Sequence, residues 1–192
     1  MRVRIGLTSS KDNSNWCELM CKRSYQADMI SYTQTRVILN SATIPSSAQS
    51  NIWRLNRIKD DQYQIILNED QDFWSNQSGW VLSAYYDKSR GCALVVLDKD
   101  TTKVPVWRIK EISNGSGDYQ ISLVKDIHKK GGVDMSGWLL CQVKEGFERG
   151  IEGWFGKLGD LFYATLCKPD SEESRKASTN WSLLITSLSQ SF

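Results

Sequence analysis

The sequence predicts an all-β protein in which one four-stranded unit occurs three times, and two observations point to this fold. The first is that three blocks recur in the same order along the chain. The second is that apolar residues alternate within these blocks, with the β-branched and aromatic enrichment typical of strands. Self-similarity of this period is typical of one supersecondary unit used repeatedly. The two clearest copies contain Trp53-Arg54-Leu55, Tyr63–Leu67 and Ser78-Gly79-Trp80, then Trp107-Arg108-Ile109, Tyr119–Leu123 and Ser136-Gly137-Trp138.

The repeats predict a single domain over residues 1–192, divided at about 1–58, 59–112 and 113–188. Four strands are expected in each repeat because matching apolar blocks appear in each. The tryptophans at repeated positions are expected in the core. The first strands cover 3–7, 63–67 and 119–123; the second begin near Trp16, Trp80 and Trp138; the third cover 35–39, 92–97 and 161–166; the fourth contain Trp53, Trp107 and Trp181.

The prolines give independent support for this division. Pro45, Pro105 and Pro169 each fall between the third and fourth strands of a repeat, and proline belongs in such connections because it cannot donate to a strand ladder. Twelve strands in three like units must share one core, so we expect a closed barrel with hairpins capping one end. A three-sheet prism with the same repeat count stays open as the alternative.

Composition and charge exclude several classes of function. Lys and Arg number 24 against 22 Asp and Glu, so no nucleic-acid partner is expected. No apolar run approaches the roughly 18 residues that a membrane span needs. Residues 1–7 alternate charged and apolar side chains, unlike a signal peptide. We therefore expect a cytoplasmic protein or one secreted by a non-classical route.

The chain contains five cysteines, an odd number, and most lie within apolar runs. They are expected to be free thiols that act as small buried hydrophobic residues, in a reducing environment. The one histidine, His128, lies among turn residues and is expected to be solvated. Because no constellation meets the requirements of catalysis or metal binding, no enzyme activity, metal or cofactor is expected.

The repeated pattern resembles a known family over the whole chain. An aromatic-x-Ile strand, a Gly-x-x-Leu segment and a Trp-x-(Leu/Ile) strand, as in Tyr63–Ile65, Gly79–Leu82 and Trp107–Ile109, are similar to the ricin B-chain-like β-trefoil. The family's Gln-x-Trp signature keeps its Trp here but not its Gln. The resemblance implies a β-trefoil with pseudo-threefold symmetry that binds sugars. The same fold class also resembles fungal trefoil cysteine-protease inhibitors, which use surface loops.

Family members bind sugars with an Asp after the Gly-x-x-Leu strand and a nearby aromatic ring. In this chain the resemblance therefore implies a site at Tyr85-Tyr86-Asp87, where the ring stacks on the sugar and the carboxylate accepts from hydroxyls. Trp74, Asn76 and Trp154 are further ligand-binding candidates because they lie in loops without counterparts in the other repeats.

The sequence thus predicts a lectin-like protein whose partners are glycans or glycoproteins. A protein-binding trefoil, such as a protease inhibitor that acts through the loops of Trp74 and Trp154, is the alternative. Whether the chain forms a homo-oligomer stays open.

Overall fold

The fold was established from a computed structural model, which describes residues 1–8, 17–22, 29–31, 34–41, 49–50, 52–68, 79–89, 91–127, 132–142, 162–176 and 179–186. Fourteen strands lie in these ranges, and all of them belong to one sheet. The only helix in the described ranges is the short α2 (Glu172–Lys176). The expectation of an all-β fold is confirmed, and a prism of three separate sheets is not what these pairings form.

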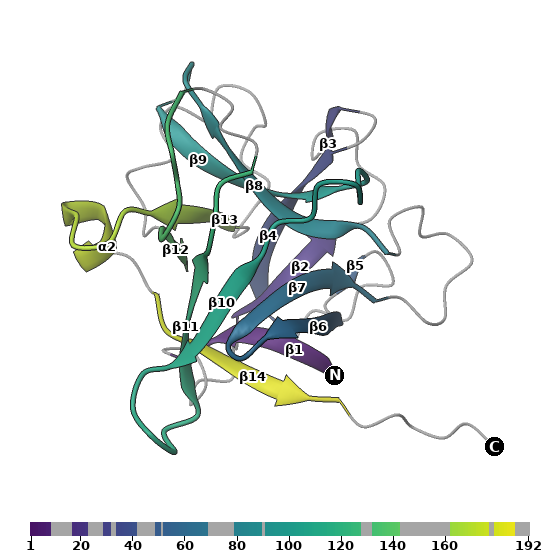
Figure 1. Cartoon of the computed structure of the whole chain (residues 1–192), viewed down its shortest axis with the longest axis vertical. Helices are drawn as coiled ribbons and strands as arrows, with labels where there is room; N and C mark the ends of the chain where they lie inside the picture. Colours follow the sequence, from purple (N-terminus) through teal and green to yellow (C-terminus); the bar gives the residue numbers. More distant parts are fainter. Residues whose placement is uncertain are drawn as a thin grey trace.

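Six strands pair in a closed ring and form a barrel (Figure 1). Each member is antiparallel to both of its neighbours, and β14 pairs with β1 to close the ring. Closure leaves the barrel without an unpaired edge. In ring order the strands are β1 (Arg2–Leu7), β6 (Trp53–Lys59), β7 (Gln62–Leu67), β10 (Trp107–Glu111), β11 (Asp118–Leu123) and β14 (Trp181–Ile185).

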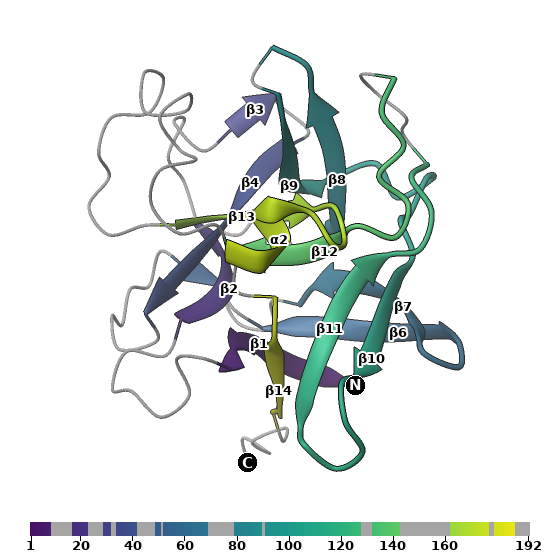
Figure 2. The same cartoon turned by 90° about the vertical axis from the view of Figure 1, so that its left-hand side faces the viewer.

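Three hairpin pairs continue from the barrel strands. The three pairs meet at β4, which pairs with both β9 and β13. Short strands β3 (Met29–Ser31) and β5 (Gln49–Ser50) add to the first pair, beyond the twelve strands expected. Figure 2 shows α2 outside β12 and β13. The pairs are β2 (Cys17–Lys22) with β4 (Gln34–Ser41), β8 (Val81–Asp87) with β9 (Cys92–Asp98), and β12 (Leu139–Gln142) with β13 (Phe162–Cys167).

Three tryptophans join the barrel to the hairpins by the same hydrogen bond. Each indole Nε1 donates at 2.9 Å to a leucine carbonyl oxygen on the second strand of its repeat, and none of the three side chains is exposed. A buried indole N–H needs such a partner. Their predicted core role is confirmed. The pairs are Trp53 with Leu19, Trp107 with Leu82, and Trp181 with Leu140.

The predicted place of Trp16 in the repeat is wrong by one residue. Gly6 of β1 pairs with Glu18, just as Ile66 pairs with Val81. The first-repeat counterpart of Trp80 is therefore Cys17, the residue before Glu18. Matching residues by type missed this register because a shift of one residue moves a side chain to the other face of its strand. Trp16 itself lies outside the described residues.

The repeated Ser-Gly-Trp motif has a backbone cause. Gly79 and Gly137 have φ angles of 82° and 81°, a left-handed conformation that favours glycine. Their amides donate to the carbonyl oxygens of Leu67 and Leu123, the last residues of β7 and β11. The carbonyl oxygen of the following Trp accepts from the amide of the same leucine. This reciprocal pair turns the chain from the barrel into the hairpin.

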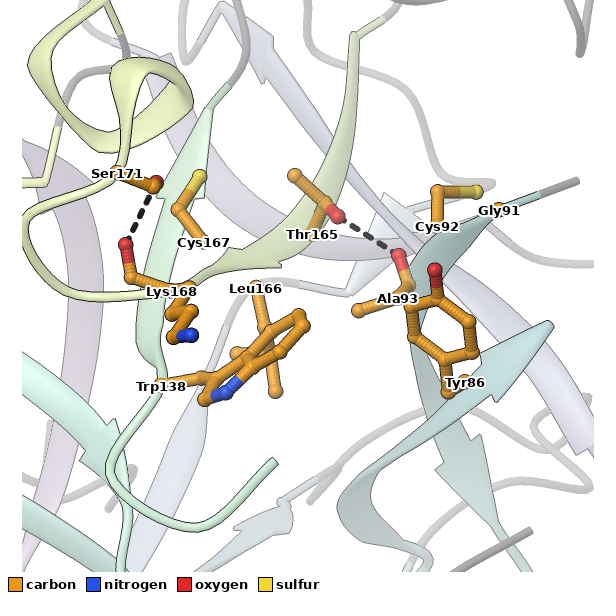
Figure 3. A pocket seen from close by; sticks show the side chains of 10 residues that line it. All are labelled: Tyr86, Gly91, Cys92, Ala93, Trp138, Thr165, Leu166, Cys167, Lys168 and Ser171. Carbon is orange, nitrogen blue, oxygen red and sulfur yellow. Dashed lines mark hydrogen bonds between the residues drawn. The ribbon is translucent and has the colours of Figure 1, made fainter. Parts of the chain in front are cut away.

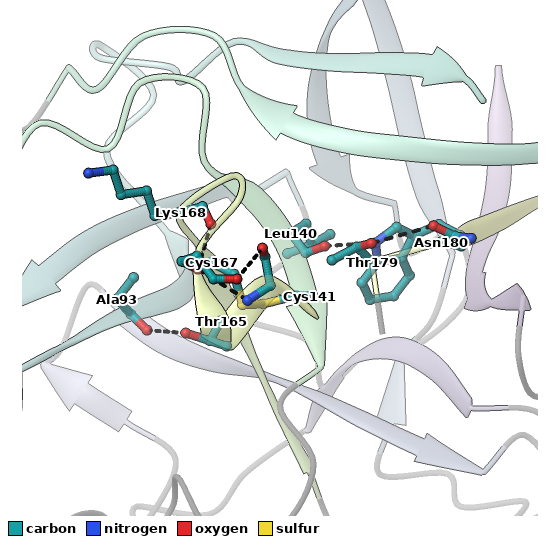
Figure 4. Close-up of a disulfide and its surroundings, with 11 residues drawn as sticks. Ala93, Leu140, Cys141, Thr165, Cys167, Lys168, Thr179 and Asn180 are labelled. Carbon is teal, nitrogen blue, oxygen red and sulfur yellow. Dashed lines mark hydrogen bonds between the residues drawn. A yellow bond between two sulfur atoms is a disulfide. The ribbon is translucent and has the colours of Figure 1, made fainter. Parts of the chain in front are cut away.

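The expectation of free thiols is wrong for Cys141 on β12 and Cys167 on β13, which form a disulfide (Figure 4). The two residues lie on adjacent antiparallel strands with their Cα atoms 6.3 Å apart, within the range that a disulfide spans. Strand pairing brought them together, and the sequence pattern gives no sign of it. Cys92, at the start of β9, is half-buried and forms no disulfide.

The described prolines lie where they were expected. Pro105 is buried between β9 and β10, and Pro169 lies between β13 and β14, whereas Pro45 lies outside the described residues. The helix among the described residues is far too short to cross a membrane.

Candidate functional site

A pocket of about 230 Å³ lies between the β8–β9 hairpin and β13 (Figure 3). It is formed where the second and third repeats meet. Trp138, the residue that precedes β12, and Tyr86 of β8 supply its aromatic lining. The remaining lining residues come from the β8–β9 turn, β9, β13 and the turn before α2, and they are Gly91, Cys92, Ala93, Thr165, Leu166, Cys167, Lys168 and Ser171.

Tyr86 and Trp138 form an edge-to-face pair, with ring centroids 6.2 Å apart and planes at 86°. This is a favoured geometry for two aromatic rings. Both side chains are half-buried and pack against the hydrophobic core. The rings are therefore held in place by packing, while part of their surface faces the pocket. Trp138 was expected in the core, and its exposure to the pocket is the difference from that expectation.

The alternation of β8 separates the three residues predicted as a sugar site. Leu82 and Ala84 belong to the core, and Tyr86 packs against the same core. Tyr85 and Asp87 have the opposite parity on the strand, so their side chains point to the other face. Of the predicted triplet, only Tyr86 lines the pocket.

The Asp87 carboxylate takes part in the β8–β9 turn. Its Oδ1 atom accepts from the Ser89 amide at 2.9 Å and from the Ser89 hydroxyl at 2.6 Å. An aspartate that bonds two residues ahead in this way is a common turn device. The other predicted ligand-binding residues, Trp74, Asn76 and Trp154, lie outside the described residues, as does His128.

Two hydroxyl groups in the lining already donate their protons within the protein. Thr165 Oγ1 donates at 2.7 Å to the Ala93 carbonyl oxygen, which ties β13 to β9. Ser171 Oγ donates at 2.7 Å to the Lys168 carbonyl oxygen and accepts from the Ser174 amide at 3.1 Å. Among the described lining residues there is no aspartate or glutamate, and Lys168 is the one ionic side chain. In the described part of the chain, no group of acids, histidines or cysteines could hold a metal ion.

Sequence reasoning missed Trp138 as a site residue, and the one sequence signal at this junction concerns its partner, Tyr86. The carbonyl oxygens of Leu19, Leu82 and Leu140 accept the tryptophan hydrogen bonds. The residues four positions after these leucines are Arg23, Tyr86 and Lys144, respectively. An aromatic side chain occupies this position in the second repeat alone. Finding its partner required knowing that Tyr86 faces the start of β12.

No protein-family model matches this chain, and no curated protein matches it either.

Proposed function

We propose that the chain is a β-trefoil of the ricin-like type that binds one sugar residue in the pocket between Tyr86 and Trp138. Three features support the trefoil: the closed six-strand ring, the three hairpin pairs beyond it, and the tryptophan-to-leucine bond that recurs in each repeat. A closed barrel with three like hairpins is the arrangement in which three such units share one core.

The observation that carries the sugar-binding proposal is the Tyr86–Trp138 pair at the pocket. The C–H face of a pyranose is apolar and flat, and it stacks on an aromatic ring whose position is already fixed. Sites for drug-sized ligands measure about 300–1,000 Å³. The pocket volume of about 230 Å³ is smaller and suits a single monosaccharide unit, such as the end of a glycan.

Polar groups around the rings would orient the sugar. The Thr165 hydroxyl already donates its hydrogen bond to the Ala93 carbonyl oxygen, so its own oxygen can accept a hydrogen bond from a sugar hydroxyl. The Tyr86 hydroxyl can donate or accept. The lining residues that the structure describes include no paired carboxylates and no histidine to act as general acid and base, so we propose binding without turnover.

A glycan array with matched tyrosine variants tests this proposal. Tyr86 and Tyr63 are both half-buried and pack against the core, but Tyr63 is not a lining residue. We expect Tyr86→Leu to weaken glycan binding about fivefold, since an aromatic contact contributes about 0.5–1.5 kcal/mol. Tyr63→Leu should leave binding unchanged. Absence of any bound glycan on the wild-type array, or equal binding by both variants, would overturn the proposal.

A protein target remains the alternative that the sequence suggests, and its predicted residues Trp74 and Trp154 lie outside the described residues. Titration of papain-like and trypsin-like proteases separates the two functions. Inhibition that persists in Tyr86→Leu would favour the protein-binding function.

Of the two expected locations, the disulfide favours secretion, because disulfides persist in oxidising compartments. Peptide mapping under non-reducing conditions, applied to protein from its native source, tests this. Unlinked Cys141 and Cys167 peptides would favour the cytoplasm.

A further inference from the structure

We propose that the sugar bound at this pocket is acidic, with a carboxylate or sulfate group that binds the Lys168 ammonium. This inference rests on the proposed sugar-binding function and names the class of sugar. It follows from the charge of the lining, the position of Lys168 and the way its backbone is held.

The charge of the described lining is one-sided. Among the lining residues that the structure describes, Lys168 is the one ionic side chain, and none is an aspartate or glutamate. Carboxylates are the usual acceptors for the paired hydroxyls of a neutral sugar, and an ammonium group is a donor with no acceptor. A lining with a cation and aromatic rings is therefore complementary to a ligand that has an anionic group beside an apolar face.

Lys168 is placed to reach such a group. It directly follows β13, and in Figure 3 its side chain runs toward the side of the pocket where the Trp138 indole lies. The residue is exposed, so its ammonium remains hydrated until a ligand arrives. Among the residues that the structure describes, no carboxylate forms an ion pair with Lys168. A ligand anion could therefore bind the Lys168 ammonium without displacing a carboxylate of the described residues.

The backbone at Lys168 is constrained on both sides. Cys167 is held to β12 by the disulfide, and Pro169 has a fixed φ angle. The Lys168 carbonyl oxygen also accepts from the Ser171 hydroxyl at 2.7 Å. These constraints fix the backbone of Lys168, so that only its side chain has conformational freedom. Such preorganisation lowers the ordering cost of binding. Figure 4 shows the lysine side chain directed away from the disulfide that anchors it.

The test compares matched sugars that differ by one group: methyl glucuronide with methyl glucoside, methyl galacturonide with methyl galactoside, and a sulfated with an unsulfated galactoside. Affinities are measured by calorimetry for the wild type, Lys168→Ala, Lys168→Arg and the control Lys103→Ala. Lys103 is also exposed but lies outside the pocket. Because both lysines are exposed, neither substitution is expected to impair folding.

We expect the acidic member of at least one pair to bind about fivefold more tightly than the neutral member, as a partly exposed ion pair would give. Lys168→Ala should lower the ratio of acidic to neutral affinity to about one, whereas Lys168→Arg should retain the preference and Lys103→Ala should have no effect. Raising the salt concentration from about 0.05 to 0.5 M should reduce the preference.

Three results would overturn the inference, and they are distinguishable from one another. If neutral sugars bind as tightly as acidic ones in every pair, and binding depends on Tyr86, the sugar-binding function stands and the acidic class is wrong. If an acid preference survives in Lys168→Ala, a different group confers it. If no sugar of either kind binds, the inference and the proposed function fail together.

Discussion

Trp80 and Trp138 occupy the same position in two repeats, yet they have different environments. Each follows a glycine with φ near +80°, and each carbonyl oxygen accepts from the last leucine of a barrel strand. Trp80 is a buried core residue with 7% exposure, whereas Trp138 is half-buried and lines the pocket beside Tyr86. The repeat therefore specifies the backbone, whereas the burial of the tryptophan side chain differs between the two copies.

The same contrast extends along the hairpins. Cys141 and Cys167 of the third repeat correspond in register to Ser83 and Asp98 of the second, since each set follows a paired Leu–Leu position. Ser83 and Asp98 are buried polar residues, whereas the cysteines form a covalent link. The third repeat thus contains both the half-exposed tryptophan and a disulfide that braces the strands beside it.

The largest expected effect comes from truncating the two tryptophans. Trp80→Ala should lower the free energy of unfolding by about 4 kcal/mol, because it leaves a cavity in the core. Trp138→Ala should cost about 1–2 kcal/mol, since less apolar area is lost from a half-buried site. Urea unfolding monitored by circular dichroism measures both. Equal losses of unfolding free energy would show that the two tryptophan environments do not differ in energy. Of the two variants, only Trp138→Ala should also abolish glycan binding.

Removing the disulfide is the next effect in size. The Cys141→Ser, Cys167→Ser double variant should lose about 3 kcal/mol of unfolding free energy, because the link closes a loop with a sequence separation of 26. Cys92→Ser is the control, as it removes a cysteine that forms no disulfide. Denaturant midpoints with and without a reductant provide the measurement. A wild type whose midpoint does not respond to reductant would contradict the assigned pairing.

Substitution of the two turn glycines, Gly79 and Gly137, should cost the same stability, because the two repeats share the same backbone turn. A Cβ placed on Gly79 or Gly137 meets nothing within 4 Å, so substitution by alanine costs only the left-handed conformation, about 1–2 kcal/mol. Both variants should shift the urea midpoint by a similar amount. A markedly larger loss at one of them would mean that the two turns differ in more than what covers their tryptophans.

Much of the fold could be predicted from the sequence because its causes are local and repeated. Period-two alternation indicated the strands, and the recurrence of Trp53, Trp107 and Trp181 indicated core positions that the structure confirms. The register of β2 and the Cys141–Cys167 link could not be predicted, because both depend on which strand lies beside which.

The candidate site was predicted less well for the same physical reason. Tyr85, Tyr86 and Asp87 are adjacent in sequence, but successive residues of a strand point to opposite faces, so the triplet cannot line one pocket. The partner of Tyr86 is Trp138, a residue from the next repeat. A site between repeats combines residues that are distant in the chain, and local sequence patterns contain no information about that pairing.

The smallest expected effect is the coupling between Tyr86 and Trp138. A double-mutant cycle with Tyr86→Leu and Trp138→Leu should give a coupling free energy of about 0.5–1 kcal/mol, the value of an edge-to-face contact beyond buried area. The parallel cycle with Tyr86→Leu and Trp80→Leu should give a coupling near zero, because Trp80 does not line the pocket. If the second coupling matched the first, the contact would not distinguish the two tryptophans. The coupling would then reflect the core that the residues share, and not the edge-to-face contact between Tyr86 and Trp138.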